Sequence, residues 1–475
     1  MKPWIGYRNE QILPIAQTHV FKRHTILWEA RHLVKVLWLC NVMPNQIKKN
    51  ENMPEGHFGG WISGLLSLMV SSNDVELTVC APVVRSASFK QRIYDILFGV
   101  EPAKYAEALG FSYYLFTVKD YHVLKCVLCP KMIETFKSII METKPDVVHI
   151  FGTEYPHSLA MVEACREMSI GCRVMVHIQG LVSVYASHFT EGLSDYLCKW
   201  PAIIEKIKRD SMLKEQKELR FRGRRFELKV LEMVNHVIGR TEWDYVCTKQ
   251  VNPNAQYHKC NEALREGFYN HAKWNIRNCI PYSIFISQGD YPVKGLHYAI
   301  EALSLLIKEF PGVHLYIAGP KLLGESKSRL SSYAKYFKRF VTRNRLDTHI
   351  TFLGLLSESQ MCERFVSSHI FVLPSTIENS PNSLGEAGIL GVPRVAAYVG
   401  GVPDMVRHGI DGFLYQHSAP YMLAGFIKRL FENDKLAVSF SKEAVMAASR
   451  IHDRSKIIET ILGTYKAIVD NEGSQ

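Results

Sequence analysis

The sequence predicts an α/β protein that contains two consecutive doubly wound domains, each built on a parallel sheet. Its 475 residues are too many for one ordinary core, and 47% apolar with 22% charged residues is typical of a globular chain. Short runs of β-branched and other apolar residues alternate with helical patterns, which indicates parallel strands with helices on both faces of each sheet. The series of runs ends near residue 241 and starts again near residue 282, so we expect two sheets that face each other across a cleft.

The expected elements follow this double series. After an extension without clear periodicity, residues 1–33, the apolar runs of the first series are residues 34–40, 75–81, 146–152, 172–180 and 235–241. The second series consists of residues 282–289, 313–320, 349–355, 369–375 and 392–398. An amphipathic helix is expected over residues 453–469. The expected domains are therefore 34–275, which includes a basic insert at 199–229, and 276–475, which ends with the terminal helix.

Cysteine usage and hydropathy favour a reduced, cytoplasmic protein. The eleven cysteines are an odd number and are scattered, unlike a disulfide framework. Cys126 and Cys129 form a C-x-x-C pair, but no second pair has metal-ligand spacing, so we expect neither a zinc nor a redox site. No stretch approaches the ~18 apolar residues of a transmembrane helix. The most apolar N-terminal run, 33–43, contains Lys35 and lacks a following cleavage site, so it is expected to be a buried first strand.

Most of the net charge of +11 belongs to one segment. Residues 199–229 carry 11 basic and 5 acidic side chains, and Trp200, Ile203, Ile204 and Ile207 have helical spacing. Such a basic amphipathic stretch can lie on an anionic membrane surface, or it can be a solvated helix face above a packed apolar stripe, and both readings stay open. Nucleic-acid binding is not expected, because no known nucleic-acid-binding module accompanies the charge.

Polar residues that follow the expected strands form the candidate site, because ligands of doubly wound sheets bind at the carboxyl ends of the strands. The segment ENSPNSLGE, 378–386, follows one such strand and opens a helix near Asn382 or Ser383. Free N–H groups at this helix start favour a phosphate, while Glu378 is placed to bind sugar hydroxyls and Glu386 a ribose. A structural alternative stays open for Glu386, because Ser383-x-x-Glu386 also fits a capping box. No such structural role is evident for Glu378.

Lys294 lies in a second strand-to-helix turn, within SQGDYPVKGLHYAIEAL, 287–303. Its ammonium is expected to offset the charge of a nucleoside diphosphate as that group departs. The alternative is a solvated lysine in a turn, which is the usual environment of an isolated lysine.

The first domain offers weaker candidates. Gly59 and Gly60 precede a helix and would let the backbone approach a phosphate or sugar. His177 and Gln179 end the fourth expected strand and are positioned to touch a sugar hydroxyl or a leaving phosphate, although a histidine among apolar residues is often a core residue. Arg240 follows the fifth expected strand and is expected to reach the cleft.

Taken together, these motifs resemble those of glycosyltransferase family 4, retaining enzymes with the GT-B fold of two facing Rossmann-like domains. The resemblance runs from about residue 34 to about residue 465. Its most specific part is Glu378-x7-Glu386, followed by GVPRVAAYVGGVPDMV and GIDGFLY, and DYPVKGL supplies Lys294. IGRTEWD and YHKCNEALREGFY, 257–269, are similar to bacterial enzymes that assemble capsular or O-antigen polysaccharide.

The resemblance implies transfer of a hexose-type sugar from a UDP- or GDP-linked donor to a saccharide or lipid-linked saccharide acceptor. The anomeric configuration would be retained, and neither a metal ion nor another cofactor would be required, in agreement with the absence of an Asp-x-Asp motif from the expected cleft loops. Carried over by position, Glu378 would bind the sugar hydroxyls and Glu386 the ribose. Asn382, Ser383 and Leu384 would hold sugar or phosphate, and Lys294 would balance the diphosphate charge. Gly60 would let the N-terminal loop approach the donor closely.

Two positions depart from the family pattern. Where the family often has an arginine five residues before the lysine, this chain has Gly289, so either Arg240 is the substitute or the diphosphate is held differently. Where the family commonly has histidine before glycine, the chain has Gln179, whose amide can accept a hydrogen bond but cannot titrate. His177 lies two residues before Gln179, not at the family's position. The role of the family's catalytic histidine is therefore unassigned in this chain.

The expected function is thus a hexosyltransferase of surface polysaccharide synthesis, cytoplasmic and peripheral at the inner face of the membrane. An epimerase or phosphorylase on the same fold is one alternative. A non-catalytic subunit that binds a sugar nucleotide is another, because of the departures at Gly289 and Gln179.

Overall fold

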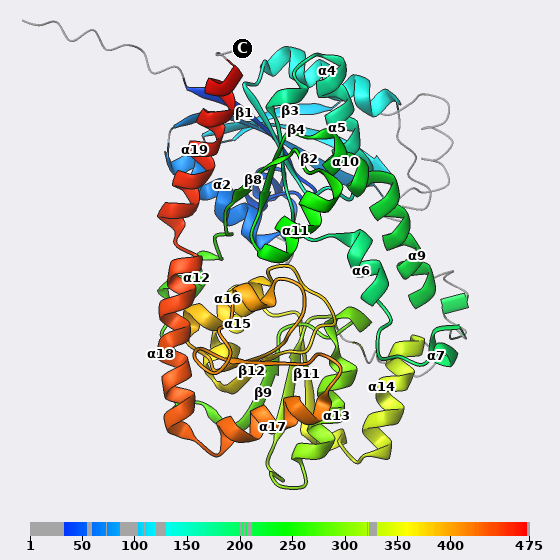
Figure 1. Ribbon diagram of the computed structural model, residues 1–475, viewed down its shortest axis with the longest axis vertical. Helices are drawn as coiled ribbons and strands as arrows, with labels where there is room; N and C mark the ends of the chain where they lie inside the picture. Colours follow the sequence, from blue (N-terminus) through cyan, green and yellow to red (C-terminus); the bar gives the residue numbers. More distant parts are fainter. Residues whose placement is uncertain are drawn as a thin grey trace, which may run out of the picture. The chain divides into compact units, whose positions relative to one another are not determined.

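A computed structural model describes most of the chain: residues 33–54, 59–72, 74–85, 103–108, 110–119, 130–199, 202, 205–206, 211–320, 322 and 330–472. Three groups of predictions lie outside these residues: the extension before residue 33, the pair Cys126 and Cys129, and the apolar stripe of Trp200, Ile203, Ile204 and Ile207. Both predicted sheets are present within the single compact unit Val34–Gln475 (Figure 1).

The first sheet has eight strands in the order β3-β4-β2-β1-β5-β6-β7-β8. All neighbours pair in parallel except β3 and β4, which are antiparallel. The strands are β1 (Val34–Leu39), β2 (Val75–Arg85), β3 (Lys104–Ala108), β4 (Phe111–Lys119), β5 (Val147–Phe151), β6 (Val174–His177), β7 (His236–Gly239) and β8 (Gln256–Lys259).

The second sheet has six strands in the order β11-β10-β9-β12-β13-β14, all of which pair in parallel. They are β9 (Ile280–Ile286), β10 (His314–Ala318), β11 (Ile350–Gly354), β12 (Ser368–Leu373), β13 (Arg394–Ala397) and β14 (Phe413–Tyr415). The strands β12 and β13 are buried along their whole length, and most of their residues are apolar.

Helices connect these parallel strands, as the crossover rule for such sheets requires. Around the first sheet they are α1 (Asn45–Asn50), α2 (Gly60–Ser72), α4 (Pro130–Thr143), α5 (Pro156–Glu167), α6 (Val182–His188), α7 (Asp195–Lys199), α9 (Met212–Arg222), α10 (Leu228–Met233) and α11 (Glu242–Val251). Around the second they are α12 (Glu266–Asn270), α13 (Leu296–Leu306), α14 (Ser332–Arg343), α15 (Glu358–Val366), α16 (Asn382–Leu390), α17 (Pro420–Phe431) and α18 (Asp434–Ile451), and the last helix of the chain is α19 (Arg454–Glu472). Short 3₁₀ or π turns are η2 (Gly171–Arg173), η3 (Gly223–Glu227), η4 (Pro292–Lys294), η6 (Asp347–His349) and η7 (Val402–Asp404).

Four strands were not predicted from the sequence, and three of them lie at sheet edges. β3, β8 and β14 each have a neighbour on one side only. β3 and β8 contain no buried residue, and β14 has three residues, so none of them forms a long apolar run. The hydrophobic pattern therefore identified the interior of each sheet more completely than its margins.

The last helix, α19, packs on the first domain, although its position in the chain led us to assign it to residues 276–475. Ile457, Ile461, Tyr465 and Ile468 repeat at helical spacing and join the apolar cluster on one face of the first sheet. The Tyr465 hydroxyl accepts a hydrogen bond from Trp38 Nε1 of β1 at 2.9 Å. In Figure 1, α18 runs along the second domain and α19 continues beside the first.

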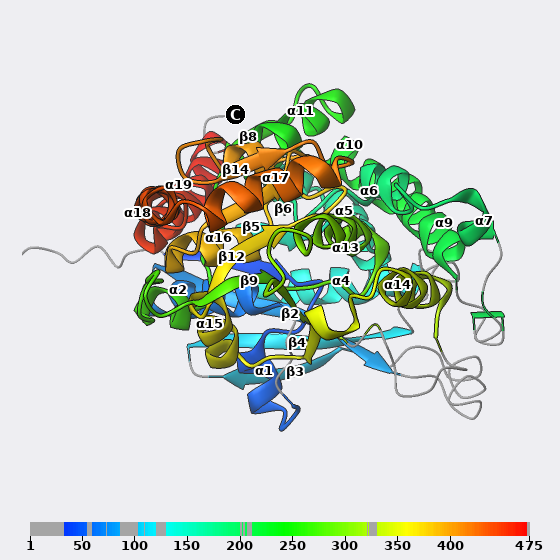
Figure 2. The ribbon, with the colours of Figure 1, turned by 90° about the horizontal axis from the view of Figure 1, so that it is seen from below.

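A second segment belongs to the first half of the chain but packs on the second domain. Phe189, Cys198 and Met212, from the region of α6 to α9, are part of the apolar core of the second sheet. The backbone N–H of Ala202 donates to Ser332 Oγ at the start of α14, at 2.8 Å. Figures 1 and 2 both show α7 beside α14. Each domain therefore completes its core with a segment from the other half of the chain.

Candidate active site

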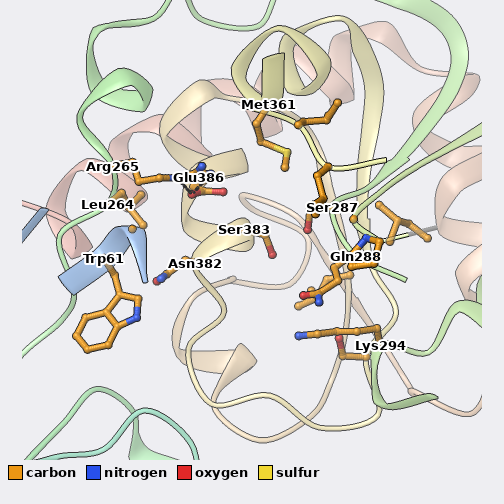
Figure 3. Close-up of a pocket in the computed structure, with 18 of the residues that line it drawn as sticks. Trp61, Leu264, Arg265, Ser287, Gln288, Lys294, Met361, Asn382, Ser383 and Glu386 are labelled. Atoms are coloured by element: carbon orange, nitrogen blue, oxygen red, sulfur yellow. Dashed lines mark hydrogen bonds and ion pairs between the residues drawn. The ribbon is translucent and has the colours of Figure 1, made fainter. Parts of the chain in front are cut away.

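A cavity of about 360 Å³ lies where the loops after the strands of the two sheets meet (Figure 3). The first domain contributes the start of α2 and the loop after β8, and the second contributes the ends of β9 to β12 and the start of α16. This is the edge at which parallel α/β sheets bind ligands. Of the residues predicted for the site, the lining includes Gly59, Gly60, Lys294, Asn382, Ser383 and Glu386.

Lys294 lies in η4, at the turn from β9 to α13. Its Nζ is 2.7 Å from Glu378 Oε1. Burial alone would lower the pKa of Lys294, but the Glu378 carboxylate raises it above its usual range, so the ammonium is charged. Gly295 has φ +67°, and a Cβ there would meet the backbone O of Pro374 at 1.8 Å, so only glycine lets the turn pack against the end of β12.

Glu378 has a structural partner that the sequence did not reveal. Its Oε1 pairs with Lys294 and accepts a hydrogen bond from Ser375 Oγ at 2.8 Å. The side chain is buried and is absent from the cavity lining. In this structure Glu378 forms an ion pair with Lys294, and its predicted contact with sugar hydroxyls stays a prediction.

The start of α16 opens into the cavity through Asn382 and Ser383. Pro381 precedes the helix, and no side chain caps this end. The first N–H groups of a helix lack partners within the helix, so this end suits an anion. Leu384 is different, because its N–H donates to the Pro381 carbonyl at 3.0 Å and its side chain is fully buried.

Glu386 does not form the capping box that the sequence left open. Its Oε1 instead accepts hydrogen bonds from Arg265 Nε at 3.1 Å and Nη2 at 2.8 Å. Burial raises the pKa of Glu386, and the Arg265 guanidinium opposes that rise. Glu386 lines the cavity, so its carboxyl group lies in the same cavity as the N-terminal end of α16.

A polar cluster outside the cavity joins the domains. Arg240 is 3% exposed; its Nη1 lies 2.7 Å from Glu262 Oε2, and its Nη2 donates to the carbonyls of Ile178 and Gln179 at 2.9 and 2.8 Å. Burial raises the pKa of Glu262, and Arg240 and the side chains of Asn382 and Gln179 oppose this. Neither Arg240 nor Gln179 lines the cavity, and their predicted roles at the donor stay predictions.

His177 lies inside the first domain. It is 1% exposed, and its ring stacks on His149 with centroids 5.6 Å apart and planes 7° apart. Burial lowers the pKa of His177 well below its usual value, so the imidazole is neutral. The nearest link to the cavity is Trp61, whose ring centroid is 6.2 Å from that of His177. A catalytic role for His177 would need this stack to move, and it stays a prediction.

Sequence reasoning missed Arg265, Trp61, Ser287 and Gln288, all of which line the cavity. Ser287 and Gln288 directly follow β9, so the strand-end rule was sufficient to find them. Arg265 follows β8, the short edge strand that the pattern did not reveal.

Among the described residues, no group of three or more His, Cys, Asp or Glu side chains is arranged to hold a metal ion, and no helix is long and apolar enough to cross a membrane.

Known sequences match mainly the second domain. Residues 270–445 match the family model Glycosyl transferases group 1. The D-inositol 3-phosphate glycosyltransferase of Streptomyces griseus is 27% identical over 164 residues, which cover 34% of each chain. Spore coat protein SA of Bacillus subtilis is 23% identical over 176 residues, 37% of this chain and 46% of its own. The matched segments thus span a third to a half of these relatives' lengths.

Solved structures resemble nearly the whole chain. Sucrose-phosphate synthase from Thermosynechococcus elongatus has a TM-score of 0.63 at 13% identity, covering 92% of this chain and 100% of its own. HepE of Anabaena in complex with UDP-glucose has a TM-score of 0.59 at 18% identity, covering 93% and 100%. The protein has the GT-B fold, and its second domain carries the sequence pattern of the group 1 glycosyl transferases.

Proposed function

We propose that the protein is a retaining glycosyltransferase that moves a hexose-type sugar from a nucleotide-sugar to a saccharide acceptor. The observation that carries this proposal is the convergence of Lys294, the start of α16 and Glu386 on one cavity, all within the residues matched by the family model. The solved complexes of HepE with UDP and UDP-glucose support a nucleotide-sugar as the donor.

The arrangement suits departure of a diphosphate. The Lys294 ammonium and the first N–H groups of α16 supply fixed positive charge, and such pre-positioned groups stabilise charge that develops as the bond to the anomeric carbon breaks. The acceptor hydroxyl would form its bond to that carbon on the face that the diphosphate leaves, held close by the first domain. Because these groups already oppose the phosphate charge, we propose that no metal ion is needed.

Donor binding tests this proposal. A calorimetric titration with UDP- and GDP-linked hexoses should show binding to the wild-type protein, and Glu386→Ala and Lys294→Ala should each weaken it by about tenfold or more, because each removes a charged hydrogen-bonding group. Lys428→Ala removes an exposed lysine that pairs with Glu309 and serves as the control. Unchanged affinity and turnover in both cavity variants would show that the site is wrongly assigned.

Products distinguish transfer from its alternatives. With labelled donor, an extended saccharide is expected. Epimerised sugar nucleotide, or cleavage that depends on phosphate, would favour the other enzymes of this fold. A protein that binds donor but is inert with every acceptor would instead favour a non-catalytic subunit.

We further propose that the enzyme acts in the cytoplasm at an anionic membrane face, in synthesis of a surface polysaccharide, where a lipid-linked acceptor would be presented. The support is an exposed basic face along α9, η3 and α10: Lys217, Arg220, Arg224, Arg225 and Lys229. An excess of basic side chains on such a face attracts anionic lipid by roughly 1 kcal/mol for each basic residue near the surface.

Vesicle co-sedimentation tests the membrane proposal. At low salt the protein should bind vesicles that contain phosphatidylserine but not purely zwitterionic ones, because the attraction is electrostatic and screened by salt. Replacing Lys217, Arg220 and Arg224 with glutamate should abolish binding. Equal binding by this variant, or none by the wild type, would reject the proposal.

A further inference from the structure

Arg265 is the one cation besides Lys294 among the residues that line the cavity, and it lies at the opposite end (Figure 3). It sits in the link between β8 and α12, a part of the chain that the functional assignment above does not use. Its guanidinium donates two hydrogen bonds to Glu386, both to Oε1. The hydrogen bonds among the described residues include none to Oε2 of Glu386.

Three elements hold Arg265 in this position. A Cβ on Gly60, the first residue of α2, would approach Arg265 Cδ to 2.8 Å, so the absence of a side chain there makes room for the arginine stem. The guanidinium carbon lies 4.6 Å from the centroid of the Phe268 ring, within range of a cation–π interaction. Glu386 completes the set from α16. The arginine is therefore fixed before any ligand arrives, and it fixes the carboxylate in turn.

The groups around Glu386 determine how its pKa depends on the pairing with Arg265. Burial and the Glu358 carboxylate of α15 both raise the pKa of Glu386, and Arg265 is the group that lowers it. Cys362, also on α15, interacts with Glu386 electrostatically, and its own burial raises its pKa to about 12, so it is neutral. His452 lies on the other side of α16, against Gly385, and burial lowers its pKa to about 4, so it too is uncharged near neutral pH. Among these groups only Arg265 contributes a positive charge.

We propose that Arg265 is a positioning residue for the donor: it holds Glu386 through Oε1 as an anion, so that Oε2 accepts hydrogen bonds from hydroxyls of the nucleotide-sugar. This inference rests on the proposed function, which places the donor at Glu386. The glycine at the start of α2 also lets that helix pack closely against the arginine that completes the donor site.

The pH dependence of donor affinity tests the role. Titrations with UDP-glucose and GDP-glucose should give a nearly constant affinity for the wild type from about pH 6 to 9, because Arg265 keeps the carboxylate ionised. Arg265→Gln should bind about tenfold or more weakly near pH 6 and recover toward pH 9, as the unpaired carboxyl loses its proton. Arg265→Lys keeps the charge but not the two-point geometry, and it should show an intermediate loss.

Glu386→Gln completes the cycle. It cannot ionise, so it should lose affinity at every pH, and Arg265→Gln in that background should cost little more. Arg454→Gln is the matched control, because Arg454 lines the adjoining groove and lies 3.7 Å from Glu266, without contact to Glu386. It should bind as the wild type does. Additive losses in the double variant, or a loss in Arg265→Gln that does not vary with pH, would overturn the positioning role.

A readout without ligand separates this inference from the proposed function. Infrared difference spectra of each protein against its Glu386→Gln counterpart should show a protonated carboxyl near neutral pH in the Arg265→Gln background only. If the wild type binds neither nucleotide-sugar, the proposed function fails and the donor role fails with it. If the wild type binds and Arg265→Gln matches it in affinity, pH profile and carboxyl band, only the role of Arg265 is overturned.

Discussion

Two ion pairs supply charged side chains to the cavity: Lys294 with Glu378, and Arg265 with Glu386. Each pairs a cation on the cavity wall with a largely buried carboxylate. A buried pair contributes little compared with a well-packed apolar replacement, but removing one partner leaves an uncompensated charge. These residues therefore couple the binding of ligand to the stability of the fold.

Lys294→Ala should lower the free energy of unfolding by about 3 kcal/mol, because it strands the Glu378 carboxylate in a buried site. Lys294→Ala combined with Glu378→Gln removes that charge and should recover much of the loss. Urea unfolding of the ligand-free proteins measures both effects. Equal destabilisation in the single and double variants would show that the stranded charge is not the cause.

At the scale of elements, α6 is held at its N-terminus by a carboxylate from a distant segment. No side chain of its own N-cap residue, Leu181, caps the helix. Instead Glu227 Oε2 accepts from the N–H of Val182 at 2.6 Å, and Oε1 accepts from the N–H of Ser183 at 3.0 Å. The cap thus ties α6 to η3, the irregular turn of the basic segment. No local sequence signal predicts a cap that comes from this far along the chain.

This cap should make stability depend on pH. Burial raises the pKa of Glu227 to about 7, whereas an unfolded glutamate titrates near 4.3. The folded state therefore holds the proton more tightly, so its contribution to stability is greatest at low pH and falls as pH rises from about 4.3 to 7. Glu227→Gln does not titrate, and its stability relative to the wild type should improve between about pH 5 and 7 in urea unfolding. A difference that stays constant across this range would contradict the assignment.

At the scale of the whole described unit, the segment that contains the donor candidates is fastened to the first domain. Asn379 Oδ1 accepts from Thr241 Oγ1 at 2.7 Å, and its Nδ2 donates to Asp244 at 2.9 Å. The backbone N–H of Asn379 donates to the Tyr185 hydroxyl at 2.9 Å. All these partners lie in the first domain, so the geometry of residues 378–386 depends on how the two sheets are placed.

Many of the strands that the sequence predicted are buried along most of their length. In β5 and β12, which are buried throughout, most residues are apolar. The edge strand β8 has no such constraint, and it was missed together with Arg265, which follows it.

The site could be predicted in part for a similar reason. Lys294, Asn382, Ser383 and Glu386 all follow strands of one sheet, and topology alone brings them together. His177 also ends a strand, but its side chain turns into the core, and a strand-end rule does not specify that direction. The cationic partners of Glu378 and Glu386 come from 84 and 121 residues away, so no local pattern reveals these ion pairs.

The path of α19 has a consequence for biosynthesis. Its apolar residues pack beside those of α1 and α2 on one face of the first sheet, yet they are translated after the entire second sheet. While the chain emerges from the ribosome, the part of that face under α19 stays uncovered until residues 454–472 arrive, and exposed apolar surface of this kind favours aggregation. The first domain, although it is synthesised first, therefore completes its core only when the end of the chain has been made.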